Sequence, residues 1–190
     1  MKKIFTLLSV ALISTAAMAQ STWKVDKAHS RLQFTITHLA VSDVDGSFKD
    51  FDVTNTSAKP DFSDAKVSLA AQTASVNTEN ERRDTHLKSA DFFDATKNPT
   101  MTFYSTAIAP NGANKYKLTG NLTLNGVTKP VIMDLWYRGT IKGQNGKENA
   151  GFKVTGTIKR SDFGFGTKYT SPTLSDEVVI TANGEFGKAS

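Results

Sequence analysis

Three histidines carry the most versatile chemistry in this chain of 190 residues, because imidazole can act as a general base or as a metal ligand near neutral pH. His29, His38 and His86 match no metal-binding spacing, since neither an HExxH sequence nor a paired-histidine motif is present. No G-x-S-x-G sequence places a serine nucleophile, and the chain has no cysteine for thiolate catalysis, disulfides or a Cys-based zinc site. We therefore predict no catalytic residue, no metal site and no enzyme activity.

A basic group, Arg82, Arg83 and Lys88, is a candidate for binding an anionic or phenolic head group. The competing interpretation is a solvated helix face that is neutralised by neighbouring acidic residues. Gly164 and Gly166 do not complete a G-x-G-x-x-G phosphate motif, so they predict a tight turn. These residues indicate no cofactor.

Large apolar side chains are abundant in the sequence. The chain contains 12 phenylalanines, 38% of its residues are hydrophobic and 22% are charged. This composition favours a soluble globular domain with no integral membrane span. The phenylalanines suit either a packed core or an apolar ligand pocket, and composition alone leaves both interpretations open.

Alternation of apolar and polar residues with a period of two predicts a mostly β protein. The clearest run is 31–38, in which Leu32, Phe34 and Ile36 share one face and polar residues share the other. Further runs have their apolar positions at Val67, Leu69 and Ala71; Met101 and Phe103; Leu118, Leu122 and Leu124; Val131, Met133 and Leu135; Phe152, Val154 and Ile158; and Val178, Ile180 and Ala182.

Turn residues separate these runs. Asn125-Gly126 predicts a two-residue type I′ hairpin, and Asn111-Gly112 and Asn145-Gly146 predict two further turns. A strand pair within residues 44–53 is expected to turn a corner at Gly46, because glycine in a strand often marks a bulge. Connections this short indicate an antiparallel sheet.

The charged segment 77–89 departs from this pattern and predicts a short helix capped by Thr78 or Asn80. Its charge is too high for a core helix, so we expect a flap packed over the end of the sheet. The residues expected to hold the flap in place are Leu87, Phe92 and Phe93.

About eight strands with one apolar face each must hide those faces together, either in two packed sheets or in one closed barrel. The alternation does not separate the two architectures. The many bulky residues on the apolar faces favour a barrel, because eight strands are enough to enclose a small ligand.

The N-terminal segment 1–19 has two lysines, an apolar run and an A-x-A site that ends at Ala19. These features predict a secretory signal peptide that is cleaved after Ala19, which leaves one domain over residues 20–190. Removing the two lysines lowers the formal net charge from +5 to +3. Because the other basic residues are scattered, no nucleic-acid partner is expected.

Several motifs together resemble the YceI-like family of exported bacterial proteins. They run in family order over nearly the whole chain after the signal segment. In this sequence they are Trp23-x-Val25-Asp26, Ala28-His29-Ser30-x-Leu32-x-Phe34, His38, Gly46-x-Phe48, Phe51, Arg83-Asp84-x-His86-Leu87-x-Ser89-x-Asp91-Phe92-Phe93-Asp94, Pro99-Thr100-Met101-Thr102-Phe103, the run from Gly120 to Val131, and Arg160-Ser161-Asp162-Phe163-Gly164.

The resemblance implies an antiparallel lipocalin-like barrel that holds a polyisoprenoid or similar long-chain amphiphile, such as a quinone-like lipid, with no established catalysis. The apolar pocket residues that it implies lie in matched motifs: Leu32, Phe34, Phe48, Phe103, Leu122, Leu124 and Val131, with Phe92, Phe93 and Phe163 near the barrel ends. The candidate head-group contacts are His38, Arg83 and His86.

We therefore expect a periplasmic carrier or reservoir for a long-chain lipid, without catalysis and with a homodimer as an open option. Two alternatives stay open at this point. One is an enzyme that acts on such a lipid with His38 or His86 as general base. The other is a stress-related protein whose barrel is solidly packed.

Overall fold

The computed structural model describes residues 19–143 and 146–189. The predicted signal segment lies outside the described residues except for Ala19, and so does Asn145 of one predicted turn. The strands are β1 (Ser21–His38), β2 (Ser42–Phe48), β3 (Phe51–Ser57), β4 (Lys66–Gln72), β5 (Val76–Asn77), β6 (Thr100–Pro110), β7 (Lys115–Leu124), β8 (Val127–Lys142), β9 (Glu148–Lys159) and β10 (Leu174–Lys188). The helical elements are α1 (Glu81–Lys88) and two 3-10 helices, η1 (Thr73–Ser75) and η2 (Arg160–Phe163).

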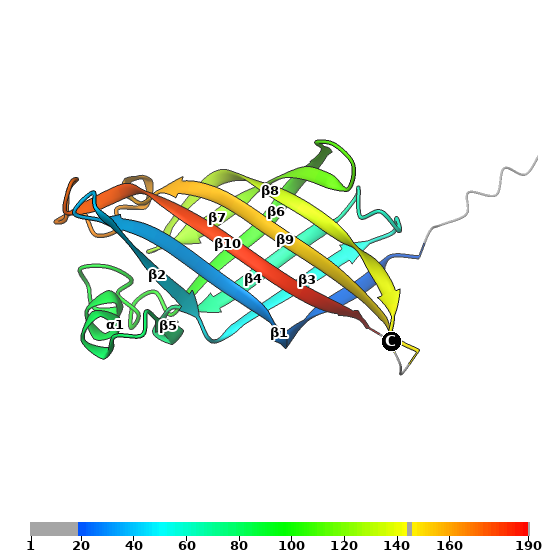
Figure 1. The fold of residues 1–190 in the computed structure, drawn as a ribbon, viewed down its shortest axis with the longest axis horizontal. Coiled ribbons are helices and arrows are strands. Elements are labelled where there is room, and N and C mark those ends of the chain that lie inside the picture. Colours follow the sequence, from blue (N-terminus) through cyan, green and yellow to red (C-terminus); the bar gives the residue numbers. More distant parts are fainter. Residues whose placement is uncertain (1–18, 144–145, 190) are drawn as a thin grey trace, which may run out of the picture.

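In the described part of the chain, eight antiparallel strands close into a barrel in the order β1, β3, β4, β6, β7, β8, β9 and β10, and β10 pairs back onto β1 (Figure 1). The short β5 and the strand β2 extend this sheet beyond the ring at the end where α1 lies. The predicted antiparallel barrel is confirmed. Two packed sheets are excluded because the β10–β1 pairing closes the ring.

The strand β1 is long and makes two successive pairings on one side. Its second half, Leu32–His38, pairs with β2, and its first four residues, Ser21–Lys24, pair with β3. Between β2 and β3 the chain bends at Lys49 and Asp50. Residues 44–53 therefore do contain two strands, but these pair with β1 and not with each other, and the break between them lies three residues after Gly46.

Gly46 lies inside β2, directly opposite Phe34 of β1, so the predicted corner at Gly46 is wrong. The reason for the glycine is space. A Cβ atom at Gly46 would lie 2.2 Å from Cζ of Phe34, so only a residue without a side chain leaves room for this ring.

Two other local predictions are confirmed. Asn125 and Gly126 form the two-residue loop between β7 and β8 with φ values of 52° and 74°, as a type I′ turn requires. The predicted helix is α1, and the side chain of Asn80 caps it by accepting a hydrogen bond from the Arg83 backbone N–H. The types of residue at these positions were therefore enough to predict the β7–β8 loop and the cap of α1.

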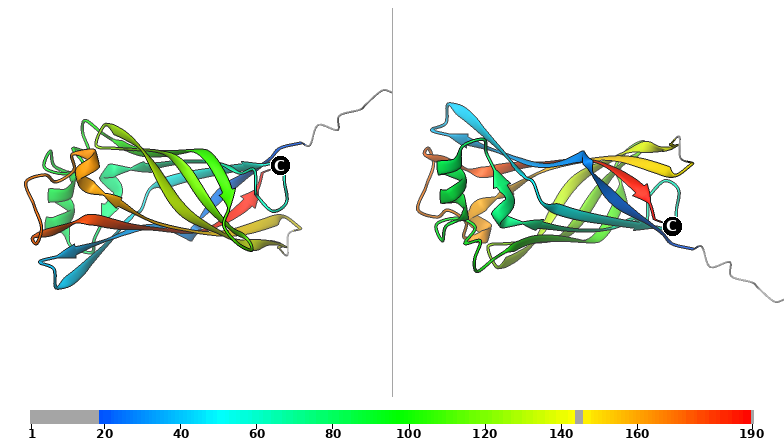
Figure 2. Two further views of the ribbon diagram at one scale, coloured as in Figure 1. Left: turned by 90° about the horizontal axis from the view of Figure 1, so that it is seen from above. Right: turned by 90° about the horizontal axis from the view of Figure 1, so that it is seen from below.

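The two ends of the barrel differ (Figure 2). We call the end that carries α1, η2 and the segment 164–173 the helical end. At the opposite end, the terminal end, β1 begins and β10 finishes, and the Ala189 N–H donates to the Thr22 carbonyl over 2.8 Å. Aromatic rings in mutual contact fill the terminal end: Trp23, Phe62, Tyr137, Phe152 and Phe186.

Candidate functional site: an apolar cavity inside the barrel

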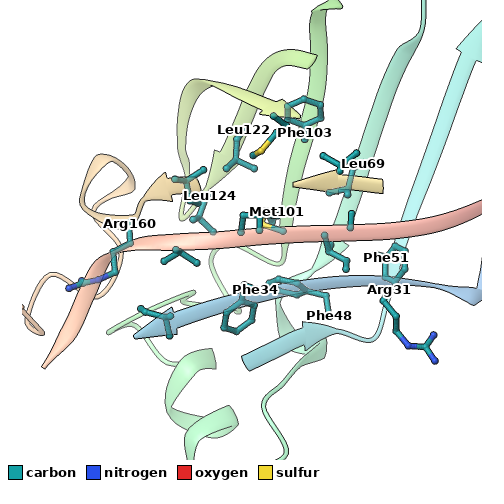
Figure 3. Close-up of a pocket in the computed structure, with 18 of the residues that line it drawn as sticks. Arg31, Phe34, Phe48, Phe51, Leu69, Met101, Phe103, Leu122, Leu124 and Arg160 are labelled. Carbon is teal, nitrogen blue, oxygen red and sulfur yellow. The ribbon is translucent and has the colours of Figure 1, made fainter. Parts of the chain in front are cut away.

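A cavity of about 430 Å³ occupies the barrel interior. Its lining includes His86 at the helical end and Phe186 at the terminal end, and most of it consists of aliphatic and aromatic side chains from the inward faces of the strands (Figure 3). The alternation that predicted the strands produces this lining, because every second residue of a barrel strand faces inward. The volume lies within the range of small-molecule binding sites.

Glycines in the barrel wall make room for large side chains that line the cavity. Phe34 lies over Gly46 as described above. A Cβ at Gly120 would lie 2.3 Å from Cζ of Phe103, and one at Gly156 would lie 2.1 Å from the sulfur of Met133. These side chains therefore lie back against the neighbouring strand, and the space that they would otherwise fill belongs to the cavity.

Most of the residues predicted for the apolar pocket line this cavity. They are Leu32, Phe34, Phe48, Phe92, Phe93, Phe103, Leu122 and Leu124. Val131 and Phe163 are not among the lining residues. Val131 is half-buried opposite Gly120, and Phe163 is 1% exposed in η2, where it packs in the hydrophobic core.

Sequence reasoning left out further lining residues, among them Phe51, Leu69, Met101, Ile158 and Phe186. Leu69, Met101 and Ile158 lie on apolar strand faces that the alternation identifies, so the alternation alone was enough to find them. Phe186 lies near the end of β10, beyond the last alternating run that the sequence analysis used. The predicted pocket was limited to residues in family motifs, so it left out other residues on the inward strand faces.

At the helical end, hydrogen bonds to Thr78 fix the position of α1. The buried carboxylate of Asp84 accepts from the Thr78 N–H (2.8 Å) and from its hydroxyl (2.6 Å). Arg83 donates through Nε to the Thr78 hydroxyl (2.7 Å) and through Nη2 to the Thr78 carbonyl (2.8 Å). Arg83 thus lines the cavity while two of its donors bind the protein itself.

His86 connects α1 to the segment 164–173. Its Nε2 lies 3.3 Å from Oδ2 of Asp91 and 3.2 Å from the hydroxyl of Tyr169. Hydrogen bonds from Lys168 and then from His86 hold the pKa of the Asp91 carboxyl below its ordinary value. His38 also lines the cavity, at the last residue of β1. All three candidate head-group residues therefore lie at the helical end.

Arg160 supports the same end of the barrel from η2, and sequence reasoning did not single it out. Its side chain is 5% exposed and donates to the backbone carbonyls of five residues. These residues are Phe165, Gly166, Tyr169, Leu174 and Ser175. Because its donors bind backbone oxygens, Arg160 fixes the course of the segment 164–173 over the cavity.

Within residues 19–143 and 146–189, no cluster of three or more His, Asp or Glu side chains is arranged to hold a metal ion. His29 lies outside the cavity lining, and its Nδ1 is 2.8 Å from Oδ2 of Asp26, with both side chains exposed. No α-helix in these ranges is both long and apolar enough to cross a membrane.

The fold and the cavity define a class of protein: a closed eight-stranded antiparallel barrel around an apolar interior. The chain belongs to the YceI-like family, since the YceI-like domain matches residues 23–186. It is 39% identical over 186 residues to a UPF0312 protein of Pectobacterium carotovorum, with 96% of each chain covered. It is 39% identical over 182 residues to the protein YceI of Salmonella newport, with 95% of this chain and 94% of that protein covered.

Solved structures show the same fold. A YceI protein of Campylobacter jejuni superposes with a TM-score of 0.75 at 40% identity, covering 81% of this chain and 90% of that one. BcnA of Burkholderia cenocepacia superposes with a TM-score of 0.77 at 27% identity, covering 85% and 98%. A polyisoprenoid-binding domain of Saccharophagus degradans gives a TM-score of 0.69 at 13% identity, covering 88% and 98%, and this likeness concerns the fold alone.

Proposed function

We propose that this protein binds a long-chain isoprenoid or similar amphiphilic lipid inside the barrel and carries or stores it without chemical change. The observation that carries the proposal is the apolar cavity of about 430 Å³. The description of the Saccharophagus degradans domain as polyisoprenoid-binding supports the choice of ligand class. Membership of the YceI-like family supports the same role.

The energetics of the cavity favour a ligand over a solidly packed barrel. An unfilled apolar interior forgoes the packing contacts of a solid core, because the lining atoms have no partner on one side. A lipid chain that fills the space gains about 25 cal/mol for each Å² of apolar surface removed from water. A stress-related protein with a merely packed barrel is therefore the less favoured alternative.

Binding without catalysis fits the hydrogen bonds at the helical end. His86 lies against Asp91 and Tyr169 at the rim, and the cavity beyond it is lined mainly by side chains without acid–base chemistry. For a ligand whose charged head group stays at this end, we propose His38, Arg83 and His86 as its contacts. An enzyme that uses His38 or His86 as general base is the alternative that the experiment below separates.

We further propose that the protein is exported to the periplasm after cleavage behind Ala19 and works there as a carrier or reservoir. The A-x-A site and the two N-terminal lysines support this proposal. Intact-mass measurement of the exported protein is expected to give a chain that starts at Gln20. A mass that includes residues 1–19 would contradict the export proposal but not lipid binding.

The test of lipid binding is organic extraction and mass spectrometry of protein purified natively from its own host. We expect one long-chain lipid class in near-stoichiometric amount and its unchanged recovery after incubation with the protein. Extraction of a variant with Phe34→Trp, which fills part of the cavity, is the control and should recover less lipid. Recovery of no lipid from the native protein would contradict the proposal, and turnover abolished by His86→Gln would favour the enzyme.

A further inference from the structure

Toward the terminal end, the cavity lining includes two buried polar side chains: Ser30, whose hydroxyl is hydrogen-bonded to the backbone of Glu185, and Asn55. Asn55 of β3 is 2% exposed and lines the cavity together with Phe51 and Val53 of the same strand face. Its carbonyl oxygen Oδ1 has no hydrogen-bond partner among the described residues. Buried amide oxygens in proteins are nearly always hydrogen-bonded, because leaving one unpaired forfeits its hydration without replacement.

The position of Asn55 along the barrel follows from the strand register. It pairs with Trp23 of β1 and with Val67 of β4. The ring of Trp23 contacts that of Phe62, with 5.3 Å between centroids, in the aromatic cluster that fills the terminal end. Asn55 therefore lies in the part of the cavity nearest the terminal end, away from α1.

No cationic side chain near Asn55 could neutralise an anionic head group. The arginine and histidine residues of the cavity lining are Arg31, His38, Arg83, His86 and Arg160. All except Arg31 lie at the helical end. The Arg31 guanidinium points away from the apolar side chains, as Figure 3 shows, and donates to the Ser30 carbonyl. A phosphate or carboxylate at the terminal end would thus be buried without a cation, at a large desolvation cost.

A neutral hydroxyl is the group that fits an uncharged buried amide. It can donate to Oδ1 and accept from the amide nitrogen, whereas an ether or ketone oxygen can only accept and a hydrocarbon does neither. Because Oδ1 is a buried acceptor without a partner among the described residues, a ligand group that pairs with it has to be a donor. An alcohol or phenol meets this requirement without introducing charge.

We infer that Asn55 binds the hydroxyl of a neutral head group, so that the lipid lies head first in the barrel with its chain directed toward α1. The inference rests on the proposed lipid-binding function and specifies its ligand class, a long-chain alcohol or phenol. It predicts that the protein distinguishes an alcohol from the ether in which a methyl group replaces the hydroxyl hydrogen.

The experiment compares the affinities of geranylgeraniol, its methyl ether and geranylgeranyl phosphate for delipidated protein and for the variant Asn55→Leu. Wild-type protein should bind the alcohol about tenfold more tightly than the ether, as expected for one buried hydrogen bond that the ether cannot make. In Asn55→Leu the two affinities should agree within about twofold. The affinity for the phosphate should not depend on Asn55 beyond the change seen for the ether.

Asn55→Ser is the companion variant, since serine keeps a small hydrogen-bonding group if leucine prevents folding, and it should retain part of the preference for the alcohol. A ¹⁵N spectrum of the wild-type protein provides a second measurement. The Asn55 side-chain amide signal should shift with the alcohol more than with the ether.

Equal affinities for alcohol and ether in the wild type would overturn the role of Asn55 while leaving lipid binding intact. The same holds for a preference that persists in Asn55→Leu. Failure of all three ligands to bind the wild type would instead overturn the proposed function, and the inference with it.

Discussion

Phe34 and Leu124 both line the cavity, but their surroundings differ. Leu124 is 6% exposed and belongs to the buried core, whereas Phe34 is half-buried, with its ring over Gly46 and 6.0 Å from the ring of Phe48. A side chain that borders a cavity contacts fewer protein atoms than one that is surrounded, so its truncation costs less in the absence of ligand. Under the proposed function, contacts with the lipid replace those missing contacts.

The position of both side chains at the cavity gives the first prediction. Phe34→Ala and Leu124→Ala should each cost clearly less than the usual 2–5 kcal/mol for core truncation in delipidated protein, and at least one of them should cost more in lipid-loaded protein. Urea unfolding of both forms measures the losses. Phe62→Ala is the control, because Phe62 is 1% exposed and is not a lining residue, and it should cost about 3–5 kcal/mol in both forms. Equal losses in both forms for the two cavity variants, near the full core value, would show that they are simple packing residues.

Individual residues also show which features of the site could be predicted from the sequence and which could not. Leu32, Phe34 and Leu124 were placed correctly on inward faces because strict alternation decides which face a residue occupies. Asn55 was not found, because an asparagine in a polar stretch gives no apolar signal. Its burial follows from the pairing of β3 with both β1 and β4, which residues distant in the chain decide.

At the scale of strands, the glycines that leave room for side chains of the neighbouring strand affect the cavity volume. In Gly46→Ala the new methyl group would need the space of the Phe34 ring, at 2.2 Å from its Cζ, so the ring must turn into the cavity. We expect a loss of about 1–3 kcal/mol in stability from overpacking and a roughly tenfold weaker affinity for geranylgeraniol. Titration of delipidated protein with this alcohol measures the change.

Gly151→Ala is the matched control, because the atom nearest to the added methyl group would be Cβ of Arg138, at an ordinary 3.5 Å. Affinity for geranylgeraniol should stay at the wild-type level in this variant. Combining Gly46→Ala with Phe34→Ala should restore the cavity space, so the two changes should be non-additive. Unchanged affinity in Gly46→Ala would show that the ring finds room elsewhere.

The loop 58–65 closes the terminal end and depends on one carboxylate. Burial by itself would raise the pKa of Asp64, but hydrogen bonds from the Ser57 hydroxyl and from the N–H groups of Ala58 and Lys59 outweigh it and lower the pKa below its ordinary 3.8. A lowered pKa means that the carboxylate contributes stability at neutral pH. That contribution is lost as the pH falls through the folded-state value.

Asp64→Ala should therefore cost about 1–3 kcal/mol at pH 7, as expected for charge-assisted hydrogen bonds, and the gap to the wild type should narrow below about pH 3.8. Urea unfolding at pH 7 and pH 3 measures both gaps. Asp134→Ala removes an exposed ion pair with Lys117 and should cost less than about 1 kcal/mol. A gap for Asp64→Ala that is the same at both pH values would contradict the assigned role of the ionised carboxylate.

Some elements could be predicted and others could not, for a common physical reason. The β7–β8 hairpin and the cap of α1 depend on residues within a few positions of each other, so Asn125-Gly126 and Asn80 identified them. The role of Gly46 depends on Phe34, which lies across a strand pairing. The conformational preference of glycine indicated a corner at Gly46. The residue instead lies inside a strand, where the Phe34 ring, from a distant part of the sequence, occupies the space of a side chain.

For the whole molecule, the alternation predicted strands and their faces but not how the sheet closes. A sandwich and a barrel need the same pattern of inward residues, and the difference lies in the pairing of β10 with β1. In that pairing Trp23 lies opposite Lys188 and Val25 lies opposite Phe186. Only the resemblance to the YceI-like family and the bulk of the inward side chains favoured closure in advance, and the family membership is now established.

The closing pair of strands has a consequence for the order of events in the life of the chain. The pairing of β1 with β10 can form only late in synthesis, because β1 begins at Ser21 and β10 ends at Lys188. Until β10 has been synthesised, β1 and β9 each lack the pairing with β10, and the apolar interior is open to water. Under the proposed function, loading with lipid therefore follows the synthesis of β10, and the earlier strands need protection from aggregation until then.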